Sequence, residues 1–153
     1  TEIYTLSLHD ALPIFILLAA GLDDRFNWSP DLSLGLELLG LALVVIGYSL
    51  GSYALIENAF FSGTVRLQPE RGHSVISSGP YAFVRHPGYL GSLITSLGMP
   101  LLLDSLWAYL PAIIIGFFFI LRTHLEDRFL RENLAGYSEY AREVRYRLFP
   151  GIW

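Results

Sequence analysis

The chain has 153 residues, the length of a single domain, and a formal net charge of −4 at neutral pH. Its 53% of hydrophobic residues and mean hydropathy of +0.47 exceed the values of an ordinary soluble domain, so they predict an integral membrane protein. The sequence has no cysteine, which excludes disulfides, thiolate zinc sites and a cysteine nucleophile.

The first residues, Thr1–Ile14, match the translation of a common short-read sequencing adapter codon by codon. We therefore interpret residues 1–14 as a non-native segment and exclude them from fold reasoning, as one would a fusion scar. Residues 15–153 are expected to form a single membrane domain that begins inside a truncated first helix. Its apolar remnant, Phe15–Leu22, is shorter than the about 20 residues that a spanning helix needs.

The segment from Leu32 to Ile56 is the best candidate for a complete membrane span. A polar turn is predicted before it, from residue 23 to residue 30, and Asp31 or Ser33 can cap the start of the helix. Glu37 is the only charged residue inside the span. An intramembrane acid is a candidate functional residue, but Glu37 lies within two turns of the helix start, so we interpret it as reaching the interface.

Two shorter apolar segments follow a polar stretch that extends from Phe60 to Pro87. They run from Tyr89 to Leu103 and from Ser105 to Leu121, and they are separated by Asp104. Each is short for a full span, so we predict a tight helical hairpin whose second arm continues beyond Arg122.

The C-terminal part is expected to form amphipathic helices at the membrane surface. Gly136 should end the second arm of the hairpin, and Tyr137–Arg147 should form a last amphipathic helix. Tyr137 and Tyr140 are interpreted as packing this helix against the membrane. Its arginines are interpreted as contacts to lipid headgroups: Arg142, Arg145 and Arg147.

The arginines predict the topology. All ten basic residues are arginines, and nine of them lie in Arg66–Arg85 and Arg122–Arg147. Alternating spans place these nine on one side, which the positive-inside rule makes cytoplasmic. The fold class predicted is all-α integral membrane, with about four transmembrane helices, the first truncated, and with the tight hairpin and C-terminal amphipathic helices. Because the arginines are interleaved with acids, no nucleic-acid partner is expected.

A polar loop at the mouth of the predicted hairpin, Ser78–Gly91, is the first candidate site. Gly79-Pro80 and Pro87-Gly88 stop a helix from running through it. Between and beside these breaks lie four side chains that can bind a ligand: Tyr81, Arg85, His86 and Tyr89. Such a loop could hold a polar cofactor, although composition alone also fits an ordinary membrane-surface loop.

An acidic pair on the C-terminal extension is the second candidate. On an ideal helix, Glu126 falls within the apolar arc, whereas Asp127 falls at its margin. A carboxylate on a packed face is costly unless it is paired, so Arg85, His86 or a ligand is its expected partner. The alternative is a solvated acid with a salt bridge; we favour the site role for Glu126 and leave Asp127 open.

The remaining histidines are interpreted differently. His73 and His124 are expected to be interfacial or loop residues, and no spacing of histidines and acids indicates a metal site.

Together these motifs resemble a known family. The combination of Gly79-Pro80-Tyr81, Arg85-His86-Pro87 and Tyr89-Leu90-Gly91 with the acidic pair Glu126-Asp127 resembles the isoprenylcysteine carboxyl methyltransferase family and the related phospholipid N-methyltransferases. The resemblance extends over residues 58–153 and is closest to bacterial members. Asp127 stands where relatives often carry a second glutamate.

The resemblance implies an integral-membrane methyltransferase that uses S-adenosyl-L-methionine without a Rossmann domain. Its cofactor site would face the cytoplasm, in a bacterial inner membrane or an equivalent one, and its partners would be membrane lipids and a lipid-like or membrane-borne acceptor. The implied cofactor-binding residues are Tyr81, Arg85, His86, Pro87, Tyr89, Glu126 and Asp127. Of these, Arg85, His86 and Glu126 would be catalytic.

The implied roles follow the chemistry of methyl transfer, in which positioning supplies most of the rate. Arg85 would suit the carboxylate of the cofactor through a bidentate contact, and Glu126 its amino group or ribose hydroxyls. A carboxylate acceptor needs no base, whereas an amine acceptor must lose a proton, for which His86 is the nearest candidate. A nicotinamide-dependent sterol-type reductase and a non-catalytic membrane protein remain as alternatives.

Overall fold

The computed structural model describes residues 8–61, 72 and 74–153, with side chains from residue 13 onward. Within these ranges all regular structure is helical, which confirms the all-α prediction. The α-helices are α1 (Leu8–Phe26), α2 (Leu34–Glu57), α3 (Pro87–Leu102), α4 (Tyr109–Asn133) and α5 (Tyr137–Glu143), with a short 3₁₀ helix, η2 (Gly79–Ala82). Arg66 and His73, for which the sequence analysis makes predictions, lie outside the described ranges.

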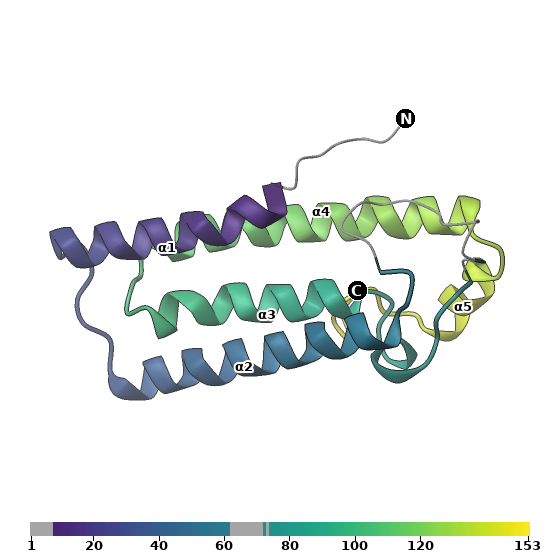
Figure 1. The fold of residues 1–153 in the computed structure, drawn as a ribbon, viewed down its shortest axis with the longest axis horizontal. Coiled ribbons are helices and arrows are strands. Elements are labelled where there is room, and N and C mark those ends of the chain that lie inside the picture. The colour runs from purple at the N-terminus through teal and green to yellow at the C-terminus, as the bar shows by residue number, and fades with distance from the viewer. Residues whose placement is uncertain (1–7, 62–71, 73) are drawn as a thin grey trace.

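Helices α1 to α4 form an elongated bundle in which successive helices run in opposite directions (Figure 1). The α1–α2 and α3–α4 connections lie at one end of the bundle. At the other end lie η2, α5 and the C-terminal segment, where the chain leaves α2 and enters α3. The candidate loop and the C-terminal residues therefore occupy the same end.

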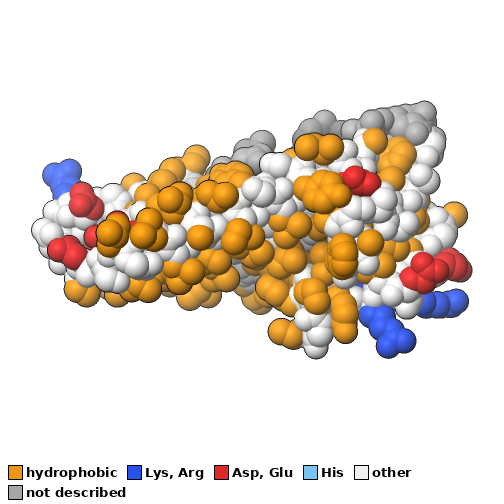
Figure 2. Space-filling model, turned by 90° about the horizontal axis from the view of Figure 1, so that it is seen from below, with side chains coloured by type: hydrophobic (Ala, Val, Ile, Leu, Met, Phe, Trp, Pro, Cys, Tyr) orange, Lys and Arg blue, Asp and Glu red, His pale blue; other side chains and the backbone are white. Residues whose placement is uncertain are grey.

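Two helices, α2 and α4, are long and apolar enough to cross a membrane, with 24 and 25 residues. Only 17% of the apolar stretch of each helix is buried within the protein, unlike the core helix of a soluble domain. Figure 2 shows hydrophobic side chains along the length of the bundle and charged ones toward its two ends. Such a surface would be unfavourable in water. Among the outward residues are Leu38, Val45, Ile46, Ile113 and Phe117.

Glycines let α2 and α3 pack with their backbones in contact. A Cβ atom added at Gly91 would lie 2.6 Å from the carbonyl oxygen of Gly47, and one at Gly98 would lie 2.8 Å from that of Gly40. No side chain fits in this interface, so these positions require glycine. Close packing through small residues is the usual way in which membrane helices associate.

The helix boundaries depart from the prediction at the end that holds the α1–α2 and α3–α4 connections. Helix α1 continues to Phe26, so the predicted turn over residues 23–30 starts at Asn27 instead of residue 23. The buried Asp23 carboxylate accepts hydrogen bonds from Ser29, through its N–H at 2.8 Å, and from Ser105, through its hydroxyl at 2.5 Å. These bonds hold the α1–α2 and α3–α4 connections against α1. Ser105 therefore lies in the second connection, and α4 starts at Tyr109 instead of at Ser105 as predicted.

Three further helix boundaries can be compared with the prediction: the start of α2 and the ends of α4 and α5. Ser33 takes the N-cap position of α2, without a cap hydrogen bond from its side chain. Helix α4 continues beyond Arg122 to Asn133, and Gly136 follows with a φ of 82°, as predicted. Helix α5 ends at Glu143 instead of Arg147, because the next residues pair with the candidate loop, as described below.

Candidate active site

The candidate loop is held between α2 and α5. Gly79 starts η2 with a φ of 55°, which favours glycine, and Pro87 takes the first position of α3. The side-chain amide of Asn58 donates to the hydroxyl of Tyr81 at 3.2 Å, and the hydroxyl of Tyr140 donates to the carbonyl oxygen of Tyr81 at 2.7 Å. The loop is therefore fixed by the end of α2 on one side and by α5 on the other.

The C-terminal segment pairs with the loop through the backbone. The N–H groups of Arg85 and His86 donate to the carbonyl oxygens of Tyr146 at 2.9 Å and of Arg147 at 3.0 Å. Both loop residues are buried, with exposed fractions of 4% and 6%. The residues after α5 thus form a strap that fixes the position of both candidate side chains.

Asp127 is the centre of a buried polar cluster and has no exposed surface. Its Oδ1 accepts from Arg85 Nε at 2.6 Å and from the Tyr137 hydroxyl at 3.1 Å. Its Oδ2 accepts from Nε of Arg147 at 3.0 Å and of Arg131 at 3.1 Å. Four donors satisfy this carboxylate, which a buried charge requires.

A second cluster joins the start of α3 to α4. The hydroxyl of Tyr89 donates to Glu126 Oε2 at 2.6 Å, and Arg122 Nε lies 3.8 Å from the same oxygen. The Arg122 guanidinium also lies over the Tyr89 ring, 5.4 Å from its centre. The Glu126 side chain keeps 22% of its surface exposed, so a ligand can reach it.

His86 lies between the two clusters. Its ring stacks on that of Tyr89, with centroids 5.8 Å apart and an angle of 13° between the planes. On its other side, Nε2 lies 3.4 Å from the hydroxyl oxygen of Tyr137. One connected set of side chains therefore leads from Glu126 to Asp127.

The tyrosines of this site are neutral hydrogen-bond donors. Burial, together with the negative charge of Asp127, raises the pKa of the Tyr137 phenol above its usual range. Burial likewise raises the pKa of Tyr140 and of Tyr81. Each phenol keeps its proton at neutral pH and can hold its neighbours in place.

The structure reverses the relative burial expected for the two acids. Asp127 is fully buried and pairs with Arg85, whereas Glu126 is partly exposed and pairs with Tyr89 and Arg122. The prediction took the apolar arc of the helix as its buried face. In the structure, the face of α4 that packs on the loop and the strap is polar, so the burial of the two acids was predicted wrongly. His124 is exposed, and no group of metal-ligating side chains occurs in the described residues.

The sequence reasoning missed four residues of the two clusters, Tyr137, Arg147, Arg131 and Arg122. Tyr137 and Tyr140 are buried within the protein, so their expected packing against the membrane is wrong. Arg147, which was expected to contact lipid headgroups, donates to Asp127 Oδ2. Arg122 precedes Glu126 by one helical turn, a spacing that could have identified it as an ion-pair partner.

A cavity of about 270 Å³ is lined by two neighbours of the second cluster, Gly88 and Phe119. It lies between α2, α3 and α4, with Pro13 of α1 in one wall, and it reaches Gly88 beside the loop. Phe119 bounds it, and the ring of Phe119 contacts that of Tyr89 with centroids 5.7 Å apart. Gly51, where an added Cβ would have no neighbour within 4 Å, leaves room for it. Its other walls are mostly apolar or hydroxyl-bearing: Leu55, Phe61, Ile115, Ser92 and Thr95. The cavity suits an apolar group next to a polar site.

Comparison with known proteins supplies the family. Residues 39–132 match the model of the isoprenylcysteine carboxyl methyltransferase (ICMT) family. A rice protein, a probable protein-S-isoprenylcysteine O-methyltransferase from Oryza sativa subsp. indica, is 33% identical over 109 residues, which cover 69% of this chain and 57% of the relative. The Saccharomyces cerevisiae protein-S-isoprenylcysteine O-methyltransferase is 32% identical over 115 residues, 70% of this chain and 46% of that protein.

A reductase is also among the relatives. A mouse Delta(14)-sterol reductase is 31% identical over 137 residues, which cover 80% of this chain and 32% of that protein. The chain thus spans only 57% of the rice methyltransferase and less of the other two. The matched region of the family model includes the Arg85–His86–Pro87 loop and the Glu126–Asp127 pair. The chain belongs to the isoprenylcysteine carboxyl methyltransferase family.

Proposed function

We propose that this chain is an integral-membrane methyltransferase that transfers a methyl group from S-adenosylmethionine to a lipid-like or membrane-borne acceptor. The observation that carries the proposal is the joining of two distant motifs. The Arg85–Asp127 and Tyr89–Glu126 contacts bring the loop and α4 together at one end of the bundle, beside an apolar cavity. Family membership and the names of the methyltransferase relatives support the same activity.

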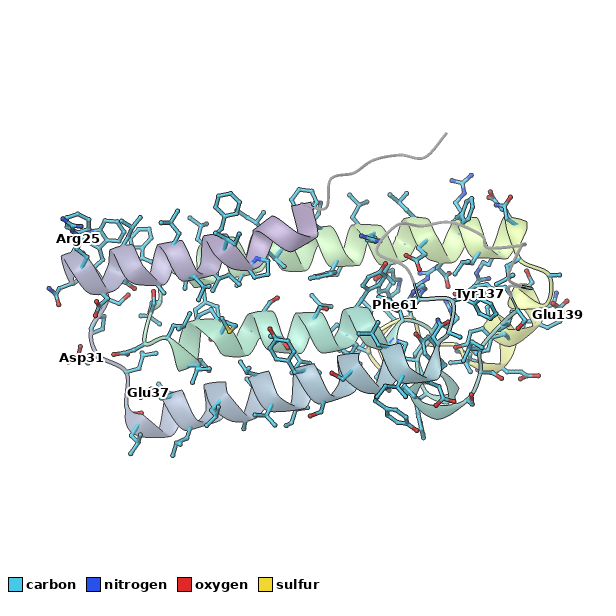
Figure 3. The ribbon with its side chains drawn as sticks, in the orientation of Figure 1. Arg25, Asp31, Glu37, Phe61, Tyr137 and Glu139 are labelled. Atoms are coloured by element: carbon cyan, nitrogen blue, oxygen red, sulfur yellow. The ribbon has the colours of Figure 1, made fainter. Side chains whose placement is uncertain are left out.

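In this proposal α2 and α4 span the membrane, and α1 and α3 lie beside them. The first turns of α1 belong to the segment interpreted as non-native. Figure 3 places Arg25, Asp31 and Glu37 at one end and Tyr137 and Glu139 at the other. The arginines of the clusters and of α5 lie at the Tyr137 end, so the positive-inside rule supports a cytoplasmic site. A cofactor made in the cytoplasm could then reach the site directly.

The polar residues fit the groups of S-adenosylmethionine. Three guanidinium groups surround the single Asp127 carboxylate, and their excess positive charge suits the carboxylate of the cofactor. The partly exposed Glu126 suits its amino group or ribose hydroxyls. Arg85 is less free than expected, because Nε binds Asp127 and Nη1 binds the carbonyl oxygens of Val144 and Arg145. A bidentate contact from Arg85 would compete with these bonds.

When bound, the cofactor supplies an activated methyl group on a sulfonium, and the protein has to place the acceptor in line with it. The packed stack of Arg122, Tyr89 and His86 provides a rigid wall for this purpose. A carboxylate acceptor is already ionised at neutral pH and needs no base. An amine acceptor has to lose a proton, and His86 is the titratable side chain between the two clusters.

The cavity between α2, α3 and α4 is the proposed place for the apolar part of the acceptor. It reaches Gly88, the residue before Tyr89, so a lipid chain lying in it could bring its polar end toward the site. The exposed apolar sides of α2 and α4 support a position of the cavity within the depth of the proposed membrane. Carboxylate and amine acceptors both remain open.

A nicotinamide-dependent reductase is the second candidate, and the specific observation that favours it is the similarity to the mouse sterol reductase over 80% of this chain. The same cationic cluster would suit a phosphate of NADPH. The two candidates differ in the cofactor that binds and in the fate of the acceptor.

The test is a transfer assay on the purified chain in lipid nanodiscs, with S-adenosylmethionine that carries tritium in its methyl group. An S-prenylated N-acetylcysteine and a phosphatidylethanolamine serve as the carboxylate and amine acceptors. We expect label in one lipid product; alkali releases it as methanol from a methyl ester but leaves it on a methylated amine. A Glu126→Ala variant is the control for background transfer. NADPH oxidation with a Delta(14)-sterol, and no label in either product, would overturn the proposal.

A further inference from the structure

The hydroxyl of Tyr137 bridges His86 and Asp127. Its oxygen lies 3.1 Å from Asp127 Oδ1 and 3.4 Å from His86 Nε2, whereas the imidazole and the carboxylate are 3.7 Å apart, too far for a hydrogen bond. All three side chains are buried. The hydroxyl of Tyr137 thus connects α5 to the loop and to α4, and the proposed function assigns it no role.

The single hydrogen of the Tyr137 hydroxyl is committed to Asp127. Arg85, Arg131 and Arg147 all donate to this carboxylate, so it is ionised and can only accept hydrogen bonds. The phenol keeps its proton, as its raised pKa also indicates. Tyr137 therefore donates to Asp127 and turns the lone pairs of its oxygen toward His86.

His86 Nε2 must then carry a hydrogen. Without one, its lone pair would face the phenol oxygen and the Asp127 carboxylate together, and both are acceptors. In a neutral imidazole only one nitrogen is protonated, so the other nitrogen, Nδ1, keeps its lone pair. Among the residues that the structure describes, none forms a hydrogen bond with Nδ1.

We propose that Tyr137 is a positioning residue that holds His86 in its Nε2–H tautomer and so presents Nδ1 as an acceptor to the ligands of the site. The tautomer follows from the contacts of the protein alone. Its use in methyl transfer rests on the proposed function.

The tautomer decides what His86 can do in the site. With an amine acceptor, Nδ1 would take one proton from the acceptor ammonium, which would leave the amine nitrogen with its electron pair. The imidazolium keeps its Nε2–H toward Tyr137, and the negative charge of Asp127 stabilises it. With a carboxylate acceptor no proton moves, and Nδ1 accepts a hydrogen bond from a bound hydroxyl or amine.

The test is long-range proton–nitrogen NMR of the chain labelled with ¹⁵N-histidine in detergent micelles, at a pH where the imidazole is neutral. A His86→Asn variant assigns the His86 signals by their disappearance. We expect a protonated Nε2 and an unprotonated Nδ1 in the wild-type chain. A proton on Nδ1 in place of Nε2 would overturn the proposal without any variant.

Two tyrosine variants on α5 test the role of Tyr137. Tyr137→Phe is expected to give a mixture in which the Nδ1–H tautomer appears, because only the Asp127 carboxylate, 3.7 Å away and beyond hydrogen-bond distance, then favours Nε2–H. Tyr140→Phe should keep the single tautomer, because that hydroxyl donates to the carbonyl of Tyr81. A single Nε2–H tautomer in Tyr137→Phe with native helicity would also overturn the proposal. The experiment needs no cofactor, so a chain with the expected tautomer but no methyl transfer would contradict the proposed function alone.

Discussion

Arg85 and Asp127, which are 42 residues apart in the sequence, form a buried ion pair with Nε 2.6 Å from Oδ1. The Arg85 side chain is 2% exposed and that of Asp127 is not exposed. Because Arg85 also binds the carbonyl oxygens of Val144 and Arg145, this pair ties the loop, α4 and the C-terminal strap together. The site and the fold of this end of the protein depend on the same contacts.

Asp127→Asn is therefore expected to lower the free energy of unfolding by about 3–5 kcal/mol, the cost of breaking a buried pair from one side. The substitution leaves Arg85 and two further guanidinium groups without their shared carboxylate. Thermal or denaturant unfolding in micelles, followed by circular dichroism, measures the change.

Glu132→Gln on the same helix is the matched control for this substitution. Glu132 pairs with Arg128, but their side chains are 59% and 74% exposed, so the loss is expected to be within about 0.5 kcal/mol. Equal effects of the two substitutions would show that the Asp127 pair does not stabilise the protein.

Tyr89→Phe is expected to weaken the binding of S-adenosylhomocysteine while leaving the fold intact. It removes the hydrogen bond that fixes Glu126, a bond to a charged group worth about 1.5–3 kcal/mol. Because this hydrogen bond holds Glu126 in place for the ligand, its loss should raise the Kd for S-adenosylhomocysteine about tenfold or more.

Tyr109→Phe is the control for the loss of a phenol hydroxyl, because Tyr109 lies at the far end of α4 and donates to the carbonyl of Leu97. Its Kd should equal that of the wild-type chain in titration calorimetry. An unchanged Kd in Tyr89→Phe would remove Tyr89 from the binding site.

The glycine contact between α2 and α3 predicts different effects for two alanine substitutions on α2. A Cβ at Gly47 would lie 2.6 Å from the carbonyl oxygen of Gly91, whereas one at Gly51 has no neighbour within 4 Å. Gly47→Ala should destabilise the protein by about 1–3 kcal/mol through overpacking, and Gly51→Ala should stabilise it by about 0.5–1 kcal/mol. Unfolding in micelles compares them, and equal shifts would contradict the close packing of the two helices.

The buried phenols predict a loss of stability at alkaline pH. Tyr137 and Tyr140 have pKa values raised above the usual 10.0, so the folded state keeps two protons that the unfolded chain releases. Their contribution to stability is complete below about pH 10 and declines as the pH rises above it. Ultraviolet titration of the phenolates should show late ionisation of several tyrosines, with two fewer late phenols in a Tyr137→Phe, Tyr140→Phe double variant. Native-state ionisation of all nine tyrosines together near pH 10 would contradict this.

Much of the fold could be predicted because hydrophobic length and helix breakers are local properties of the sequence. The span of α2, the hairpin and the extension of α4 beyond Arg122 all follow from such patterns. The end of α1 could not be predicted, since Asp23 is retained in the helix by bonds from Ser29 and Ser105. The strap likewise leaves helical geometry to bind the backbone of distant residues.

The members of the site were easier to predict than their partners. Arg85, His86, Tyr89, Glu126 and Asp127 do lie together, but the pairing of each acid was not visible in the sequence. An apolar arc on one helix cannot show that a polar strap covers the helix. Tyr137 resembled a membrane-facing residue for the same reason, although it contacts Asp127.

The most direct test of the account is the binding of S-adenosylhomocysteine to the detergent-purified chain by titration calorimetry, with Glu126→Ala, the control Glu132→Ala, and NADPH as a competing ligand. The account predicts binding by the wild-type chain and by Glu132→Ala, no displacement by NADPH, and an affinity lowered about 10- to 100-fold in Glu126→Ala through the loss of a charged hydrogen bond. Binding of NADPH in preference to S-adenosylhomocysteine, or an unchanged affinity in Glu126→Ala, would contradict it.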